Sequence, residues 1–250
     1  MLTKNELMLL SGLIYKVYTI RDLREMRESL LEAIRPLIGY DMATFELASE
    51  DKPYHVSDPV GIGTSRKSMQ HYLDEVQEYD YGRWTYAAPS GGVYRESDFM
   101  PDDKRVNTPY YQNFFKPEGV HYSLMLVIIK SQTFYGCLAL FRSRESGDFT
   151  EREAFILNLL QDHIGYRLES EKKSKEQMSA IFPDQSTLIA KYGLTLRESE
   201  ITNLLLRGLS VDMICDQLSI TPNTLKKHRA NIYKKIGINS AGELLKLLKT

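Results

Sequence analysis

The sequence contains few cysteines, and their placement excludes two kinds of site. Its 250 residues include only Cys137 and Cys215, with no Cys-x-x-Cys pair. Two isolated cysteines in apolar stretches support neither a disulfide framework nor a zinc site, so we expect both to be core residues. The longest apolar run, near Leu124 to Ile129, is too short to cross a bilayer, which needs about 20 residues. The first residues lack the pattern of a signal peptide. We therefore expect a cytoplasmic protein without membrane contact.

The sequence also lacks the signatures of catalysis. It has no nucleophile elbow and no metal-ligand pair, and Gly61-Ile62-Gly63-Thr64 lacks the remaining residues of a phosphate-binding loop. His55, His71 and His121 are isolated along the chain. We therefore predict no catalytic residue, no metal and no cofactor, and we expect the protein not to be an enzyme.

Charge is distributed unevenly along the chain, although the net charge is only −1. From Ala190 to the end, ten Lys and Arg residues stand against five acidic residues, so this segment carries +5 and the remainder −6. Opposite charges predict two domains with different partners, of which the basic one suits a polyanion.

Hydrophobic periodicity predicts a mixed α and β domain over residues 1–170. Its expected elements are helices over 3–17, 20–37 and 66–79, strands over 40–47, 121–130 and 133–142, and a long helix that begins at Thr150. Thr150 and Glu153 form a capping box, and Ser131-Gln132 form a turn between two strands. The stretch 80–121 is irregular, with a hairpin signal at Ser90-Gly91-Gly92.

A linker over residues 171–188 is expected to separate this domain from a second one over 189–250. The charged run 169–176 extends the preceding helix, and Phe182-Pro183-Asp184 breaks it. Four helices follow, and residues typical of helix ends mark them: Thr195 with Glu198, Gly208, Ser210, Thr221-Pro222, Gly237, and Ser240 with Glu243.

The third of these helices, Thr221 to Ile236, is expected to bind DNA. At about 100° per residue its aliphatic side chains share one face, with His228 as a packing residue, while lysine and asparagine share the other. Lys and Asn can bind base edges in the major groove, lysines at its margins neutralise phosphates, and helix starts offer N–H groups to phosphates. The candidate DNA-binding residues are Ser210, Thr221, Asn223, Thr224, Lys226, Lys227, Ala230, Asn231, Lys234 and Lys235. A solvated basic surface helix is the alternative on charge pattern alone.

Residues 194–243 resemble the LuxR/GerE-type helix-turn-helix family. The matching runs are Leu194-Thr195-x-Arg197-Glu198, Gly208-Leu209-Ser210, Ile214 to Leu218, Thr224-Leu225-Lys226-x-His228 and Asn231 to Ile238. The resemblance implies that the third helix enters the major groove and that the fourth supports dimerisation. Ser240 and Cys215 depart from the family, which commonly has Arg and Ala there.

The N-terminal domain contains three short motifs, Thr108-Pro109-Tyr110-Tyr111, Leu140-Phe141-Arg142 and Asp148-Phe149-Thr150. With the order of its elements, these motifs resemble GAF-type domains, and an autoinducer-binding domain of similar architecture is the alternative. The expected fold class is α+β: a GAF-like α/β/α sandwich with an antiparallel sheet, linked to a small all-α, four-helix helix-turn-helix domain.

Aromatic residues are concentrated between Tyr79 and Tyr122. Aromatic side chains in an irregular stretch above a sheet can line a ligand pocket, with phenols that orient the ligand. The candidate pocket residues are Tyr79, Tyr81, Trp84, Tyr86, Tyr94, Tyr110, Phe114 and Tyr122. The alternative is that they fill a core under long loops.

Together these patterns predict a homodimeric transcription regulator that binds double-stranded DNA and responds to a small-molecule effector. RNA polymerase is a further expected partner. A first alternative is a regulator whose N-terminal domain docks a protein and binds no ligand. A second alternative is an enzyme tethered to DNA.

Overall fold

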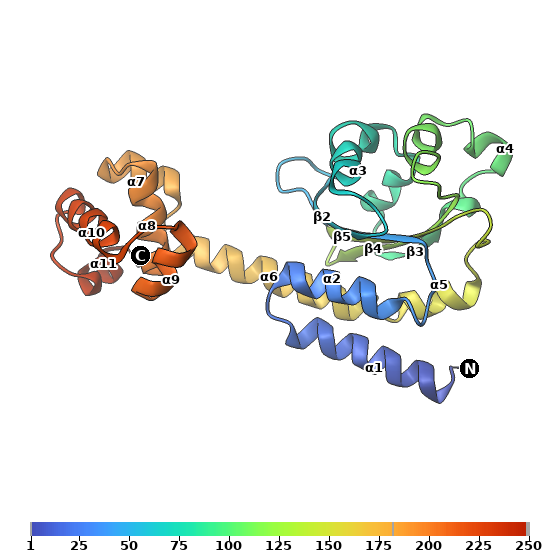
Figure 1. The fold of residues 1–250 in the computed structure, drawn as a ribbon, viewed down its shortest axis with the longest axis horizontal. Coiled ribbons are helices and arrows are strands. Elements are labelled where there is room, and N and C mark those ends of the chain that lie inside the picture. Colours follow the sequence, from blue (N-terminus) through green and yellow to red (C-terminus); the bar gives the residue numbers. More distant parts are fainter. Residues whose placement is uncertain (1, 182, 249–250) are drawn as a thin grey trace. The chain divides into compact units, whose positions relative to one another are not determined.

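The computed structural model describes residues 2–181 and 183–248, and the chain divides into two units, residues 1–170 and 171–250 (Figure 1). The boundary between them falls within helix α6 (Gln161–Ile181), so the charged run 169–176 is helical. Pro183-Asp184 follows this helix, and Phe182 of the predicted break lies outside the described residues.

Two helices begin the first unit, α1 (Lys4–Thr19) and α2 (Leu23–Ile34). Thr3 and Glu6 form a capping box at the start of α1, and the Asp22 carboxylate accepts the Glu25 N–H at the start of α2. These caps satisfy N–H groups that have no partner inside the helix. The two predicted helices are therefore confirmed with slightly shifted ends.

A five-stranded antiparallel sheet forms the centre of the first unit, in the order β2-β1-β5-β4-β3. Its strands are β1 (Met42–Ala48), β2 (Val56–Ile62), β3 (Gly92–Arg95), β4 (Tyr122–Lys130) and β5 (Thr133–Arg142). Ser131 and Gln132 turn β4 into β5 with positive φ angles of 50° and 60°. The three predicted strands and this turn are confirmed.

The two edge strands were not predicted. β2 contains Pro59 and Gly61, residues that disfavour a central strand but are tolerated at an edge. The hairpin interpretation of Ser90-Gly91-Gly92 is wrong, because Gly92 instead starts the short strand β3, which pairs with the distant β4. Both edges depend on tertiary pairing rather than on local periodicity.

The sheet separates two cores because alternate residues of a strand point to opposite faces. Leu124, Leu126 and Ile128 of β4 pack with the helices on one face. Met125 and Val127 pack with the aromatic segment on the other. Figure 1 shows α1, α2 and α5 (Glu151–Asn158) on the first side, and α3 (Arg66–His71) and α4 (Asp102–Arg105) on the second. This arrangement confirms the α/β/α sandwich.

Two predicted helices are interrupted. The capping box of Thr150 and Glu153 is present, but the long helix that it starts divides into α5 and α6 at Leu159 and Leu160. The helix predicted over 66–79 continues beyond α3 as the π-helical turn η1 (Tyr72–Val76) and a 3₁₀ turn (Gln77–Tyr79). Such turns commonly occur in helices near functional sites.

The second unit contains, beyond the end of α6, helices α7 (Gln185–Tyr192), α8 (Leu196–Leu206), α9 (Val211–Leu218), α10 (Pro222–Ile236) and α11 (Ala241–Leu248). The last four correspond to the four predicted helices. Helix α7 lies across the end of the expected linker and was not predicted. Its Leu188 side chain is fully buried against Leu194, Leu206 and Leu244. Leu188, at the end of the expected linker, therefore contributes to the core of this unit.

We expect Leu188→Ala to destabilise the second unit by about 2–4 kcal/mol, because it leaves a cavity in a small core. Native-state hydrogen exchange of the α8 amides in the full chain measures this loss. The matched control is Ile189→Ala, since Ile189 is 36% exposed and should change α8 exchange little. Equal effects of the two variants would contradict the packing of α7 onto this unit.

Candidate nucleic-acid interface and effector pocket

Helix α10 has one buried and one exposed face. Thr221 caps its start, Pro222 occupies the first turn, and Gly237 ends it with a φ of 80°, a conformation that glycine adopts without strain. Leu225 and Ile232 are buried in a cluster with residues of α8 and α9. The exposed face is therefore determined by the packing of the buried one.

Polar and basic residues occupy the exposed face of α10. The exposed residues there are Asn223, Lys226, Lys227, Ala230, Asn231 and Lys234, whereas Thr224 and His228 are half-buried. Among the described residues, no ion pair or hydrogen bond involves the ammonium groups of Lys226, Lys227 and Lys234. Three cations and two amides are thus available to a partner on one helix face.

Lys235 differs from these lysines, because its ammonium group bonds within the unit. Its Nζ donates to Glu198 Oε2 at 2.6 Å and to the Gly193 carbonyl at 3.0 Å. Burial by itself would raise the pKa of Glu198, but the hydrogen bonds from Lys235 and from the Thr195 backbone hold it below its usual value. Lys235 therefore links α10 to α8, and its predicted role in DNA binding stays a prediction.

Ser210 and Thr221 act as helix caps. Ser210 Oγ accepts the Met213 N–H at 3.3 Å, and Thr221 Oγ1 accepts the Thr224 N–H at 3.2 Å. Both residues are exposed. Their hydroxyls fix the starts of α9 and α10, which leaves backbone groups of each first turn to face a polyanion.

A small cavity of about 20 Å³ lies in the first unit, on the sheet face opposite α1 and α2. Of the eight predicted pocket residues, Tyr86, Tyr110 and Phe114 line it. Further lining residues that sequence reasoning missed include Thr44, Glu46, Tyr72, Asp80, Cys137 and Phe141. Half of the missed residues lie on β1 and β5, outside the aromatic segment. Glu46, a charged residue within the apolar strand β1, was the sequence signal that could have indicated that β1 lines the cavity.

The other five predicted residues lie away from the cavity. Trp84 and Tyr79 are 59% and 37% exposed. Tyr94 packs edge-on against Trp84 at 5.9 Å between ring centroids, and the Tyr81 hydroxyl donates to Glu96. Tyr122 packs with the core on the helix side of the sheet, because its position in β4 alternates with that of Met125. Aromatic density alone could not distinguish these environments.

Two buried acids are part of the cavity wall. Asp80 accepts from the Tyr72 hydroxyl at 2.7 Å through Oδ2 and from the Gly82 N–H at 2.7 Å through Oδ1. Burial raises the pKa of Asp80 despite these bonds. Burial also raises the pKa of Glu46 to about 7, with a further increase from nearby Asp80, while Thr44 and Arg27 oppose the change. Burial therefore disfavours the charged form of both carboxyl groups in the wall.

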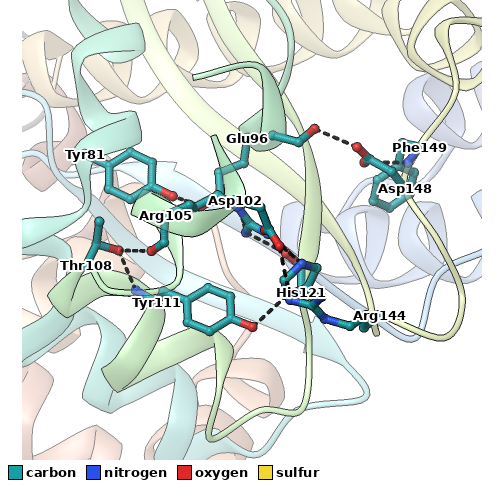
Figure 2. Close-up of polar contacts among 11 residues, drawn as sticks. Tyr81, Glu96, Asp102, Arg105, Thr108, Tyr111, His121, Arg144, Asp148 and Phe149 are labelled. Carbon is teal, nitrogen blue, oxygen red and sulfur yellow. Dashed lines mark hydrogen bonds and ion pairs between the residues drawn. The ribbon is translucent and has the colours of Figure 1, made fainter. Parts of the chain in front are cut away.

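A buried arginine holds the irregular segment beside the sheet (Figure 2). Arg105 donates to Glu96 Oε2 at 2.8 Å, to Asp102 Oδ1 at 2.6 Å, and to the carbonyl of His121 at 2.6 Å. Its side chain and that of Glu96 are both 1% exposed. Because several charge-assisted bonds meet at one guanidinium, this network fixes the position of the segment that carries the cavity wall.

His121 belongs to this network, although it is isolated along the chain. Its ring lies 2.7 Å from the Tyr111 hydroxyl and 2.9 Å from the Arg105 guanidinium (Figure 2). Burial and the Arg105 charge lower the pKa of His121, and Asp102 opposes them. The imidazole is therefore neutral at pH 7. It serves as a packing and hydrogen-bonding group beneath the segment.

The two cysteines are free and buried, and burial raises the pKa of each thiol. Within residues 2–181 and 183–248, no cluster of His, Cys, Asp and Glu side chains is arranged to hold a metal ion. No helix in the described part of the chain is both long and apolar enough to span a membrane.

The helices α8 to α10, with a tight turn before a basic third helix, define the second unit as a DNA-binding helix-turn-helix domain of a transcription regulator. Residues 193–248 match the family described as bacterial regulatory proteins, luxR family, so this domain belongs to that family.

Two curated relatives agree with this class. The chain is 27% identical over 181 residues to an HTH-type transcriptional regulator in the exeN 3′ region of Aeromonas salmonicida, over 66% of this chain and 85% of that one. This match is longer than the second unit and therefore extends into the first. The transcriptional regulatory protein UhpA of Escherichia coli K12 is 37% identical over 51 residues, which cover 20% of this chain and 26% of UhpA.

Among solved structures, a GAF domain supports the fold of the first unit. The GAF domain of a phosphoenolpyruvate-protein phosphotransferase from Coxiella burnetii superposes with a TM-score of 0.53 at 15% identity. The superposition covers 69% of this chain and 97% of that domain. The GAF-like architecture predicted for this unit is thus confirmed as a fold.

We expect Glu46→Gln to change how stability depends on pH. The folded-state pKa of about 7 exceeds the ordinary value of 4.5, so the native state holds more protons between these values, and stability falls as pH rises through this window. From pH 4.5 to pH 8 the variant should gain about 3 kcal/mol relative to the wild type, as measured by urea unfolding at each pH. Parallel pH profiles of the two proteins would contradict the burial of this carboxyl.

Proposed function

We propose that this protein is a sequence-specific regulator of transcription that inserts α10 into the major groove of double-stranded DNA. The observation that carries the proposal is the exposed face of α10, whose lysines have no partner among the described residues while the opposite face packs in the domain core. A basic helix face whose lysines form no bonds among the described residues suits a polyanion. The match to the luxR family supports DNA as that polyanion.

Residues of this face would divide into two roles. Lys227, Asn223 and Ala230 lie at its centre, where Lys and Asn can bond to base edges and Ala allows close approach. Lys226 lies at the edge of this face on the helix wheel, and Lys234 lies on the face but close to the end of α10. At both positions an ammonium group can neutralise a phosphate.

Regulation is the role we propose for the first unit. Its cavity would bind a small molecule in one conformational state more tightly than in another, and so shift the population of states that bind DNA. Two copies of the chain would read two half-sites, as helix-turn-helix dimers do. Such a regulator would act in the cytoplasm, with RNA polymerase as a further partner.

The roles of the lysines can be tested by single substitutions. We expect Lys227→Ala to weaken operator binding by about 1–3 kcal/mol and to weaken nonspecific binding less. Lys226→Ala and Lys234→Ala should each weaken binding to all sequences and reduce the salt dependence by about one unit of slope. Fluorescence anisotropy at several salt concentrations measures both quantities, with an operator identified by genome-wide mapping.

The matched control for these substitutions is Lys246→Ala. Lys246 is an exposed lysine of α11 in the same unit, so its removal changes the net charge equally without altering α10. If Lys246→Ala weakens binding as much as the α10 variants do, or if none of the α10 variants changes affinity, the proposed interface is wrong.

A further inference from the structure

The cavity of the first unit is acidic. Glu46 and Asp80 line it, and its described lining contains no Lys, Arg or His. Glu46 is 7% exposed and lies on β1 with its side chain on the cavity side of the sheet, since the neighbouring Phe45 packs on the helix side. A ligand in this cavity therefore meets two carboxyl groups and no cationic side chain.

Neither carboxyl group of the wall has an ion-pair partner among the described residues. Both oxygens of Asp80 accept hydrogen bonds, from Tyr72 and from Gly82. The Glu46 carboxyl accepts from the Thr44 hydroxyl and from its own backbone N–H, and no lysine, arginine or histidine side chain in the described part of the chain pairs with it. Burying a carboxylate without a compensating cation is costly. Glu46 is thus a buried acid of the wall that lacks a paired cation.

Aromatic rings form much of the remaining wall. Tyr72 lies 5.2 Å from Phe114 between ring centroids, and Tyr110 stacks on Phe114 at 5.8 Å. Tyr86 closes another side of the cavity. The faces of aromatic rings attract cations, and this attraction is stronger where water is excluded. The carboxyl groups and the aromatic rings of the wall therefore both favour a cationic ligand.

We propose that the effector is a small organic amine that binds as the ammonium ion, with its charged nitrogen at Glu46 and its apolar body among Tyr72, Tyr86, Tyr110 and Phe114. The inference rests on the proposed function, because it names the ligand class of the proposed regulatory pocket. The ammonium group supplies the paired cation that Glu46 lacks, and the rings supply the apolar and π contacts. A carboxylate ligand would be repelled by both acids.

Ligand entry requires the cavity to widen, since about 20 Å³ holds little more than one water molecule. The residues best suited to move are on the wall opposite the sheet. Met69 is an unbranched, adaptable side chain in that wall. Tyr72 and Phe114 lie in the π-helical turns 72–76 and 111–115, whose hydrogen bonding is less regular than that of an α-helix.

Calorimetry and thermal unfolding of the full chain test this inference with defined probes. 2-Phenylethylamine, butylamine and 1,4-diaminobutane are the amines, while 2-phenylethanol and 3-phenylpropionate are the neutral and anionic counterparts of the first. We expect at least one amine to bind and raise the Tm, and its alcohol and acid counterparts to bind at least tenfold more weakly. Binding by none of the amines, or equal binding by the alcohol or the acid, would overturn the inference.

The role of Glu46 has its own readout. Glu46→Gln should weaken amine binding at least tenfold, whereas Glu50→Gln, an exposed acid just beyond β1, should leave it unchanged. Because ionisation of Glu46 accompanies binding, the wild-type Kd should fall about tenfold from pH 6 to pH 8 and the variant's Kd should stay nearly constant. A pH-independent Kd in the wild type, or unchanged affinity in Glu46→Gln, would contradict the assignment.

These results separate this inference from the proposed function. The salt dependence of DNA binding without any amine tests α10 alone, and it should be the same in the control Glu50→Gln, which lies outside the cavity lining, as in the wild type. If the α10 lysine variants lose DNA binding but no amine binds the wild type, the proposed function is supported and only the amine inference is wrong. If the wild type binds an amine but no DNA, the amine inference is supported and the proposed function is wrong.

Discussion

The packing of Leu225 and Ile232 against α8 and α9 determines what the second unit can do. With these two side chains buried, the 3.6-residue period of α10 leaves Asn223, Lys227 and Ala230 on the side that faces water. The link from Lys235 to Glu198 secures the same orientation from the far end of the helix. A rotation of α10 by one residue would expose the aliphatic side chains and bury charge, so the core of the domain selects the face offered to DNA.

In the first unit the alternation of side chains across the sheet has a comparable effect. The sheet directs Phe45 toward the helices and Glu46 toward the cavity, although the two residues are adjacent. The Arg105 network then holds the irregular segment over that cavity (Figure 2). A buried carboxyl without a cationic partner lowers stability at neutral pH, and this cost is consistent with a site arranged for a ligand rather than for the fold alone.

Local signals predicted much of the fold, because capping boxes and helix-ending glycines act within a few residues. Thr195, Thr221 and Gly237 are examples, and α10 could be oriented from its sequence. The edge strand β3 and the cavity could not be predicted in this way, since Gly92 pairs with Val127 and Glu46 meets Asp80 only through tertiary structure. For the same reason Lys235 and Lys234 were indistinguishable in sequence, although only Lys235 has an acidic partner.

The central claim is that the exposed face of α10 is the surface that binds DNA. Hydrogen–deuterium exchange of the full chain, with and without a specific duplex, tests it most directly. The account predicts slower exchange in peptides covering the start of α9 and residues 221–236 when the duplex is bound. It also predicts unchanged exchange in β4 and β5, whose amides lie within the sheet. Unchanged exchange over 221–236, with protection confined to another surface, would contradict it.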